Sequence, residues 1–204
     1  FLMGVRSIVP EAKMEVNYTN SWGDYDTEKS MATAMIEDGC VIISQHSDTE
    51  GPAEACEDAT KKGTTVFHVG YNQSMVDIAP DSSLISSRQD YAPYEVGAVK
   101  AVMDGTELPV DQWAGFDEGW VAMTELNEKI AAKGTQEAMD AAIKDFKDGK
   151  LTAKDIYKGD YKGTNPFDKN DTIDLTEGFA ENSTQSAPTF AYVLDDIITV
   201  LSTN

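Results

Sequence analysis

Histidine and cysteine are scarce in this chain, and their scarcity limits its chemistry. The 204 residues include two histidines and two cysteines. Zinc and iron sites draw their ligands from these residue types together with carboxylates. His46 and Asp48 could supply two ligands, but the other histidine, His68, lies inside a predicted strand. We therefore expect no metal site.

Positive charge and long apolar runs are also lacking. Sixteen Lys and Arg face 36 Asp and Glu, a formal net charge of -20, which repels phosphate backbones and anionic lipid surfaces. Nucleic acid is not an expected partner. No apolar run approaches the roughly 18 residues of a membrane span, and the first ten residues lack the regions of a signal peptide. Because the chain begins with Phe1, we interpret it as a mature product or a fragment, and its compartment stays open.

The two cysteines, Cys40 and Cys56, are predicted to stay unpaired. If Cys40 begins a strand and Cys56 lies one turn into the returning helix, their heights along the layer differ by roughly 10 Å. We expect two buried thiols.

Known catalytic patterns are absent too. Ser47 or Ser87 could join His46 and Asp48 in a triad, but residues adjacent on one turn rarely form the required relay, and there is no GxSxG motif. There is also no P-loop or GxGxxG motif, so no cofactor is expected. Residues 168–177 resemble a calcium loop but lack its sixth-position glycine, and Phe179 stands where the glutamate should be. We expect a solvated acidic turn there.

The first 90 residues alternate short apolar runs with amphipathic segments. We predict strands at 14–19, 40–44, 64–70 and 82–87, and helices at 24–39 and 51–63. Asp24 is the expected N-cap of the first helix and Gly39 its stop. The side chains expected on its inner side are Met31, Ala34, Met35 and Ile36. This order predicts an α/β fold with a mostly parallel sheet flanked by helices.

Polar clusters follow all four predicted strands: "NSWGD", "QHSDT", "YNQSM" and "RQDY". In parallel sheets, ligands bind outside the carboxyl ends of the strands. The clusters would form a wall of hydrogen-bonding groups for a small polar ligand.

The pattern changes after residue 90. We predict a helix at 91–105, an aromatic segment at 112–123 that includes a strand, and an amphipathic helix at 135–150. The inward side chains of the last helix are expected to be Ala138, Ala141 or Ala142, and Phe146. The final 50 residues are rich in turns and close with a strand near 190–194.

Several of these segments are familiar in combination. "NSWGD", "DGCVIISQHSDT", "APYE" before a helix, "GFDEGWVAM" and "GTNPFDKNDTIDL" resemble the basic membrane protein (BMP) family of ABC-transporter substrate-binding lipoproteins, which includes purine nucleoside and purine base receptors. The similarity runs through nearly the whole chain, and it rests on the order and spacing of the motifs.

The resemblance implies a type I periplasmic-binding fold, in which two α/β lobes clamp a ligand between them. On that plan, 1–88 form most of the second lobe, 89–125 form a hinge crossing and a return to the first lobe, and 126–204 form a C-terminal helix and tail with a closing strand. The chain is then the C-terminal portion of a longer receptor. The missing part would carry most of the first lobe and a lipid anchor.

The resemblance also implies a set of ligand-binding residues. The loop after the second strand contacts the ligand in this family, and the next loop contributes a polar group. Asp90 stands where nucleoside receptors of this family carry a lysine. This difference favours a free purine base as the ligand. The implied residues are Trp22, Gln45, His46, Ser47, Asp48, Asn72, Asp90 and Tyr91. Trp22 could instead anchor its loop beneath the second predicted helix.

The leading hypothesis is therefore a non-catalytic, extracytoplasmic solute receptor. It would bind a purine base or nucleoside and deliver it to an ABC permease. Two alternatives remain open at this point: a nucleoside hydrolase using His46 and Asp48 as acid and base, and a ligand-sensing module of a regulator or receptor.

Overall fold

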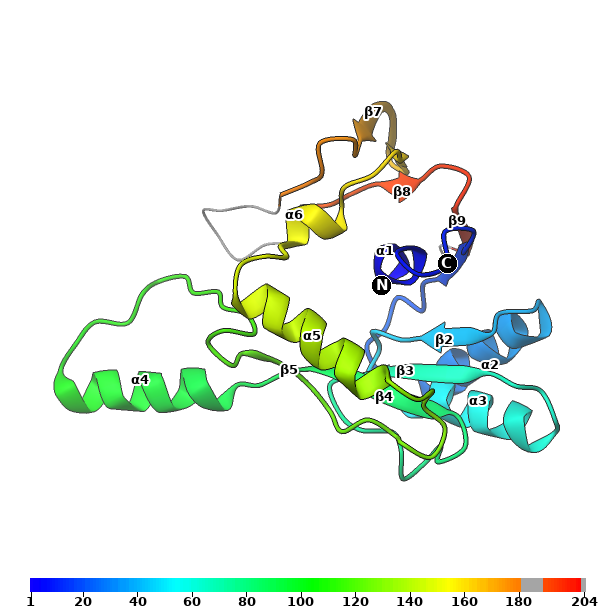
Figure 1. Ribbon diagram of the computed structural model, residues 1–204, viewed down its shortest axis with the longest axis horizontal. Coiled ribbons are helices and arrows are strands. Elements are labelled where there is room, and N and C mark those ends of the chain that lie inside the picture. The colour runs from blue at the N-terminus through cyan, green and yellow to red at the C-terminus, as the bar shows by residue number, and fades with distance from the viewer. Residues whose placement is uncertain (181–188, 203–204) are drawn as a thin grey trace. The chain divides into compact units, whose positions relative to one another are not determined.

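The computed structural model describes residues 1–180 and 189–202 (Figure 1). The chain divides into two compact units. Of the described residues, unit 1 contains 1–17, 108–113 and 142–202, and unit 2 contains 18–107 and 114–141. Each unit is described by itself.

Unit 2 is built on a four-stranded sheet in the order β2-β3-β4-β5. Strands β2 (Ile42–Ser44), β3 (Phe67–Tyr71) and β4 (Ser83–Gln89) are parallel, as predicted, and β5 (Val121–Met123) runs antiparallel to β4. The short fourth strand comes from the predicted aromatic segment. The mixed α/β fold class is confirmed.

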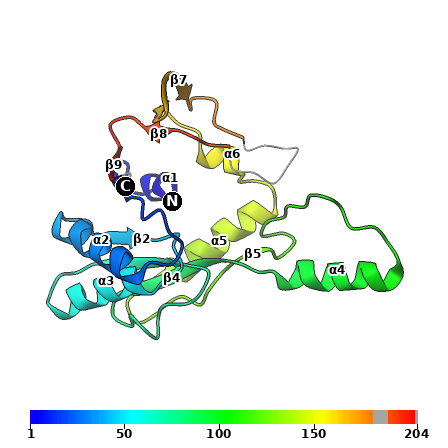
Figure 2. The same cartoon turned by 180° about the vertical axis from the view of Figure 1, so that it is seen from behind.

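Helices α2 (Tyr25–Glu37) and α3 (Gly51–Lys61) pack against each other and against the strands of this sheet (Figure 2). The Asp24 carboxylate accepts from the Thr27 N–H at 3.2 Å, which confirms the predicted N-cap. The two helices approach closely at Gly51, where an added Cβ would lie 2.8 Å from the Tyr25 carbonyl oxygen. Only glycine fits between the two backbones at this point.

The main core lies between the two helices and the sheet. Its buried members are Ala32, Ile43, Ala55, Cys56 and Val66, with Met35, Ile36, Cys40 and Ala59 at the margin. Neither cysteine forms a disulfide in the described part of the chain, as predicted. Cys56 is buried, and burial raises its pKa to about 12, whereas Cys40 is half-buried rather than buried as expected. The prediction that Ala34 faces inward is wrong, because Ala34 is exposed and Ala32 holds the buried position.

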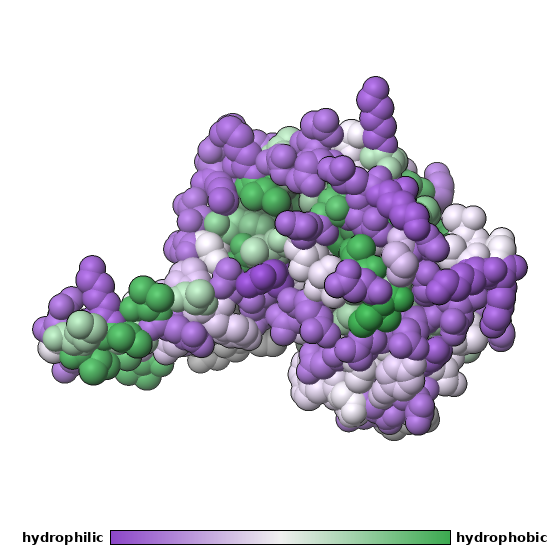
Figure 3. All heavy atoms as spheres, turned by 90° about the horizontal axis from the view of Figure 1, so that it is seen from below, coloured by the Kyte–Doolittle hydropathy of each residue, from purple (hydrophilic) through white to green (hydrophobic). Residues whose placement is uncertain are grey.

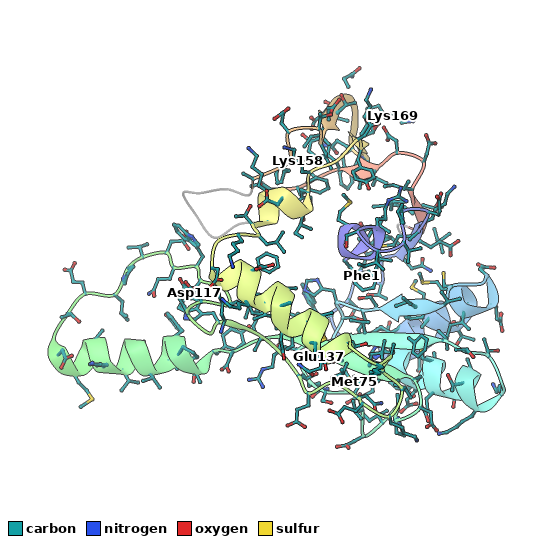
Figure 4. The ribbon with its side chains drawn as sticks, in the orientation of Figure 1. Phe1, Met75, Asp117, Glu137, Lys158 and Lys169 are labelled. Carbon is teal, nitrogen blue, oxygen red and sulfur yellow. The ribbon has the colours of Figure 1, made fainter. Side chains whose placement is uncertain are left out.

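A smaller core lies beneath the loop between β3 and β4. Met75, labelled in Figure 4, is fully buried with Ala53 and Ala79. The neighbouring turn is held by buried Glu57, which accepts from the Asp81 N–H and the Ser82 hydroxyl at 3.0 and 3.1 Å.

Helix α4 (Ala92–Asp104) confirms the predicted helix but buries none of its residues. Its exposed apolar side chains include Val96, Val99, Val102 and Met103. They form the apolar surface on the arm at the left of Figure 3.

Helix α5 (Thr135–Lys147) is also present as predicted, but its less exposed face differs from the expected one. Ala138, Ala141 and Ala142 are exposed, whereas Met139, Ile143 and Phe146 are half-buried. The prediction is therefore confirmed for Phe146 and wrong for the alanines, because the larger apolar side chains at i, i+4 and i+7 gain more from leaving water.

Unit 1 holds the two ends of the described chain. After α1 (Leu2–Arg6), strand β1 (Met14–Asn17) pairs in parallel with β9 (Ile198–Ser202). The prediction that 14–19 joins the next three strands in one sheet is therefore wrong. A pairing partner some 180 residues away leaves no local sequence signal.

The rest of unit 1 contains the short helix α6 (Ala153–Ile156) and a three-stranded sheet, β7-β6-β8. Strands β6 (Lys162–Asn165) and β7 (Asp168–Asp174) form a hairpin, so the expected acidic turn at 168–177 is mostly a strand, with largely exposed side chains. Strand β8 (Val193–Leu194) confirms a strand near 190–194, but it is not the closing strand as predicted, because β9 follows it.

Residues 1–180 and 189–202 contain no helix that meets the length and hydropathy requirements of a bilayer span. The same ranges contain no group of three or more His, Cys, Asp and Glu side chains arranged to hold a metal ion.

Gly70 and Ser86 give a stability test of the sheet. A Cβ added to Gly70 would lie 2.3 Å from the Ser86 hydroxyl, which is buried without a hydrogen-bond partner in the described part of the chain. Gly70→Ala should lower the free energy of unfolding by about 1–3 kcal/mol through overpacking. Ser86→Ala should be near neutral, and the double variant should be more stable than Gly70→Ala when measured by chemical denaturation. Additive costs would contradict this contact.

Buried His68 should make stability depend on pH. Desolvation lowers its pKa from 6.5 to about 4, so between these values the unfolded chain binds more protons than the folded one. The contribution of His68 to the free energy of unfolding should be fully present above pH 6.5 and should be lost as the pH falls to 4. At about 1.4 kcal/mol per pKa unit, the loss is up to about 3 kcal/mol. Parallel denaturation series of the native chain and His68→Gln measure this loss as a difference in pH slope. Parallel slopes would contradict it.

Candidate functional site

Three aromatic rings gather beyond the carboxyl ends of β2 and β3. The His46 ring lies edge-on to Trp22, with centroids 5.8 Å apart, and edge-on to Tyr71 at 4.4 Å. His46 comes from the loop after β2, and Tyr71 is the last residue of β3. Trp22 is 66% exposed, which does not favour a role as a buried loop anchor. The cluster presents ring surface to solvent.

Two further side chains belong to this cluster. The pKa of Tyr71 is raised, first by burial and then by the proximity of the Tyr91 and Asp48 side chains. Tyr91 donates its hydroxyl hydrogen bond to Gln89 and is 57% exposed. The structure thus places His46, Asp48 and Tyr91 near Tyr71, with Trp22 against the His46 ring.

Asn72 and Asp90 lie in the adjoining loops. Asn72 adopts a left-handed conformation with φ 68°, its N–H donates to the Ser87 carbonyl at 2.6 Å, and its side chain is exposed. Asp90 is half-buried; its carboxylate lies 3.4 Å from the Arg88 guanidinium and accepts from the Ala92 N–H at 3.1 Å. Asp90 thus has a structural role at the start of α4.

The loop between β2 and α3 alternates in exposure. Gln45, Ser47 and Thr49 are half-buried, while His46 and Asp48 are exposed. The inward residues have internal partners: Gln45 bonds to His68, and the Ser47 and Thr49 hydroxyls bond to Glu28. Of the predicted site residues in this loop, His46 and Asp48 are therefore the two that face outward.

Sequence reasoning missed three residues around this loop: Tyr71, Glu28 and His68. Tyr71 could have been found as an aromatic residue at the end of a strand, next to Asn72. Glu28 stands four residues before buried Ala32 on the inner side of α2, and an acid on an apolar helix face is a detectable anomaly. His68 was placed correctly in a strand, but its partners come from distant segments.

A shallow hollow on α2, lined by Asp26, Lys29, Ser30, Thr33, Ala34 and Glu37, does not share these features. It contains no aromatic ring. Its only cation, Lys29, already lies 2.9 Å from Glu54 and 3.1 Å from Asp58. We therefore assign the candidate site to the aromatic cluster.

Chemically, the cluster offers apolar ring edges and faces beside exposed polar groups. Asp48 accepts hydrogen bonds, and the Asn72 amide both donates and accepts. Such a combination suits a flat ligand with an apolar ring and polar edges.

Comparison with known proteins identifies relatives of this chain. A purine-binding protein of Brucella abortus is 33% identical over 145 residues, covering 71% of this chain and 40% of that protein. A putative ABC transporter glucose-binding protein of Haloferax volcanii is 28% identical over 129 residues, covering 63% of this chain and 32% of that protein. The chain thus spans well under half the length of these two relatives.

Two solved structures share the fold. An ABC transporter solute-binding protein from Conexibacter woesei aligns with a TM-score of 0.56 at 15% identity, over 75% of this chain and 50% of that one. A transcriptional activator of the comK gene from Bacillus halodurans aligns with a TM-score of 0.53 at 18% identity, over 66% and 46%. Residues 1–150 match the Bmp family model, described as ABC transporter substrate-binding protein PnrA-like, and the chain therefore belongs to this family.

Proposed function

We propose that this chain is the ligand-binding part of an ABC importer's solute receptor, and that its ligand is a purine base or nucleoside. The observation that carries the proposal is the aromatic cluster of Trp22, His46 and Tyr71, with Asp48 and Tyr91 beside it. Family membership supports the receptor role.

The cluster suits a purine for two chemical reasons. A heteroaromatic ring gains from stacked or edge-on contact with Trp22 and Tyr91, which are both exposed. Its ring N–H and exocyclic amino groups need acceptors, which Asp48 supplies, while its ring nitrogens need donors, which Asn72 supplies. Asp90 is the remaining candidate contact, at the position that favours a base over a nucleoside.

The named relatives differ in their ligands. The Brucella relative is named for purine binding, which agrees with this proposal, whereas the Haloferax relative is named for glucose binding. Sugars also pack on exposed aromatic rings, so a test of the purine assignment must include glucose.

The transport role would follow from closure of two lobes around the ligand. A permease would recognise the closed form, and the ligand shifts the population toward it by binding the closed form more tightly. We propose an extracytoplasmic location, with a lipid anchor on a part of the receptor preceding this chain.

The hydrolase alternative requires His46 to act as acid or base on a bound nucleoside. In this structure the His46 ring is engaged edge-on by two aromatic rings, which supports a binding role. Stoichiometric binding without product formation would eliminate the hydrolase. Turnover of a nucleoside that His46→Ala abolishes would establish it.

Calorimetry of the full-length receptor tests the ligand class. The panel comprises adenine, guanine, hypoxanthine, adenosine, inosine, riboflavin and glucose. We expect saturable binding of at least one purine base, with weaker binding of the corresponding nucleoside. Binding of glucose with no response to any purine would overturn the assignment.

Trp22→Ala tests the site. Losing one aromatic contact worth about 0.5–1.5 kcal/mol should weaken purine binding roughly 3- to 10-fold. The matched control is Trp113→Ala, because Trp113 is similarly exposed, at 58%, and is not one of the predicted site residues. The control should leave the affinity unchanged, and equal effects of the two substitutions would remove Trp22 from the site.

A further inference from the structure

We propose that Glu28 and His68 are positioning residues that brace the loop at 45–49 from beneath, so that His46 and Asp48 face the ligand. This inference rests on the proposed function for the role of the two outward side chains. The brace itself is defined by contacts within unit 2 and can be tested without a ligand.

Glu28 holds the loop by accepting hydrogen bonds from the hydroxyl groups of Ser47 and Thr49. Its Oε2 accepts from the Ser47 hydroxyl at 2.8 Å and from the Thr49 hydroxyl at 2.6 Å. Its Oε1 accepts from the Asp24 N–H at 3.1 Å. Three donors thus converge on this one side chain, whose two oxygens act as acceptors.

The setting of Glu28 is unusual for a purely structural residue. Its side chain is 3% exposed, and no cation lies within salt-bridge distance of it in the described residues. Burying an unpaired carboxylate is costly, and the hydrogen bonds offset that cost only while all are made. An apolar residue would serve the α2 packing face better. The carboxylate is explained by the loop that it holds.

His68 holds the loop through Gln45. The His68 Nε2 lies 2.8 Å from the Gln45 Oε1, and its Nδ1 lies 3.1 Å from the Ser83 hydroxyl. The Gln45 Nε2 donates to the carbonyls of Ser47 and Thr49, both at 2.8 Å. This amide orientation leaves Oε1 as the acceptor, so His68 must carry its proton on Nε2, and Nδ1 accepts from Ser83.

The two supports act on the same residues from different sides. Glu28 binds the side chains of Ser47 and Thr49, and Gln45 binds their carbonyl oxygens. A third bond, from the Asp48 N–H to the Trp22 carbonyl at 2.7 Å, ties the loop to the segment that carries the aromatic ring. With positions 45, 47 and 49 held by internal partners, His46 and Asp48 are the exposed residues of this loop.

The first experiment compares Glu28→Gln with Glu57→Gln in the full-length receptor. Glu57 is a control of equal burial at 2% exposure, and it also accepts from a backbone N–H and a serine hydroxyl. It serves the turn at 79–82 and, unlike Glu28, is paired with a cation, Lys61, at 3.1 Å. Both variants lose one buried charge. Only Glu28→Gln removes a hydrogen-bond acceptor that holds the loop at 45–49.

Amide hydrogen exchange at Asp48 is the ligand-free measurement. We expect Glu28→Gln to accelerate it about tenfold, as for the loss of one hydrogen bond to a charged group, and Glu57→Gln to leave it unchanged. Purine affinity should fall by a similar factor in Glu28→Gln alone. If both variants behave alike, the brace is wrong. Faster exchange in Glu28→Gln alone, with no purine bound by the native receptor, would support the brace and reject the proposed ligand.

A second variant tests the same contacts in case Glu28→Gln does not fold. Ser47→Ala with Thr49→Val removes both hydroxyl donors from the loop end of the same contacts and leaves α2 unchanged. It should also accelerate exchange at Asp48. Unchanged exchange in this variant would overturn the role of Glu28.

The His68 arm is tested by its tautomer and by Gln45→Glu. Long-range nitrogen–proton spectra of the imidazole should show a protonated Nε2 and an unprotonated Nδ1; the reverse would contradict the chain of bonds through Gln45. Gln45→Glu places a carboxylate against the carbonyls of Ser47 and Thr49, and should accelerate exchange at Asp48. Retention of native exchange would exclude Gln45 from the brace.

Discussion

The buried carboxylate of Glu28 is the constraint on which the candidate site depends. It lies on the inner side of α2, where the rest of the helix contributes apolar side chains to the core. Its three donors come from the start of its own helix and from the loop after β2. The packing of α2 on the sheet is therefore linked to the conformation of the loop that carries His46 and Asp48, because one side chain takes part in both.

The sheet provides the other half of the arrangement. Parallel pairing of β2, β3 and β4 brings the loops that follow them to one edge. Buried His68 and Ser83 form a polar chain with half-buried Gln45. At the ends of the strands, Tyr71 and His46 form an aromatic pair. The same strands thus supply the rigid support and the exposed rings, and the desolvated histidine links the support to pH.

Local patterns predicted the elements of unit 2 well. The Asp24 cap, the helix that stops before Gly39, and the apolar strand "CVII" leading into a polar loop each depend on near neighbours in the chain, so the sequence contains their signals. The pairing of β1 with β9 could not be predicted, because register between distant segments depends on the whole fold. In the site, residue types predicted the loop, but the inward roles of Gln45 and Ser47 depend on partners 23 and 19 residues away.

The alternation along the loop separates residues with internal partners from residues that are exposed. Positions 45, 47 and 49 are committed to internal partners, while positions 46 and 48 are exposed. A substitution at an exposed position changes the surface that meets a ligand without removing a hydrogen bond that shapes the backbone. Under the proposed function, substitutions at His46 and Asp48 would alter the ligand-facing surface with little loss of stability, whereas substitutions at positions 45, 47 and 49 would remove bonds that shape the loop.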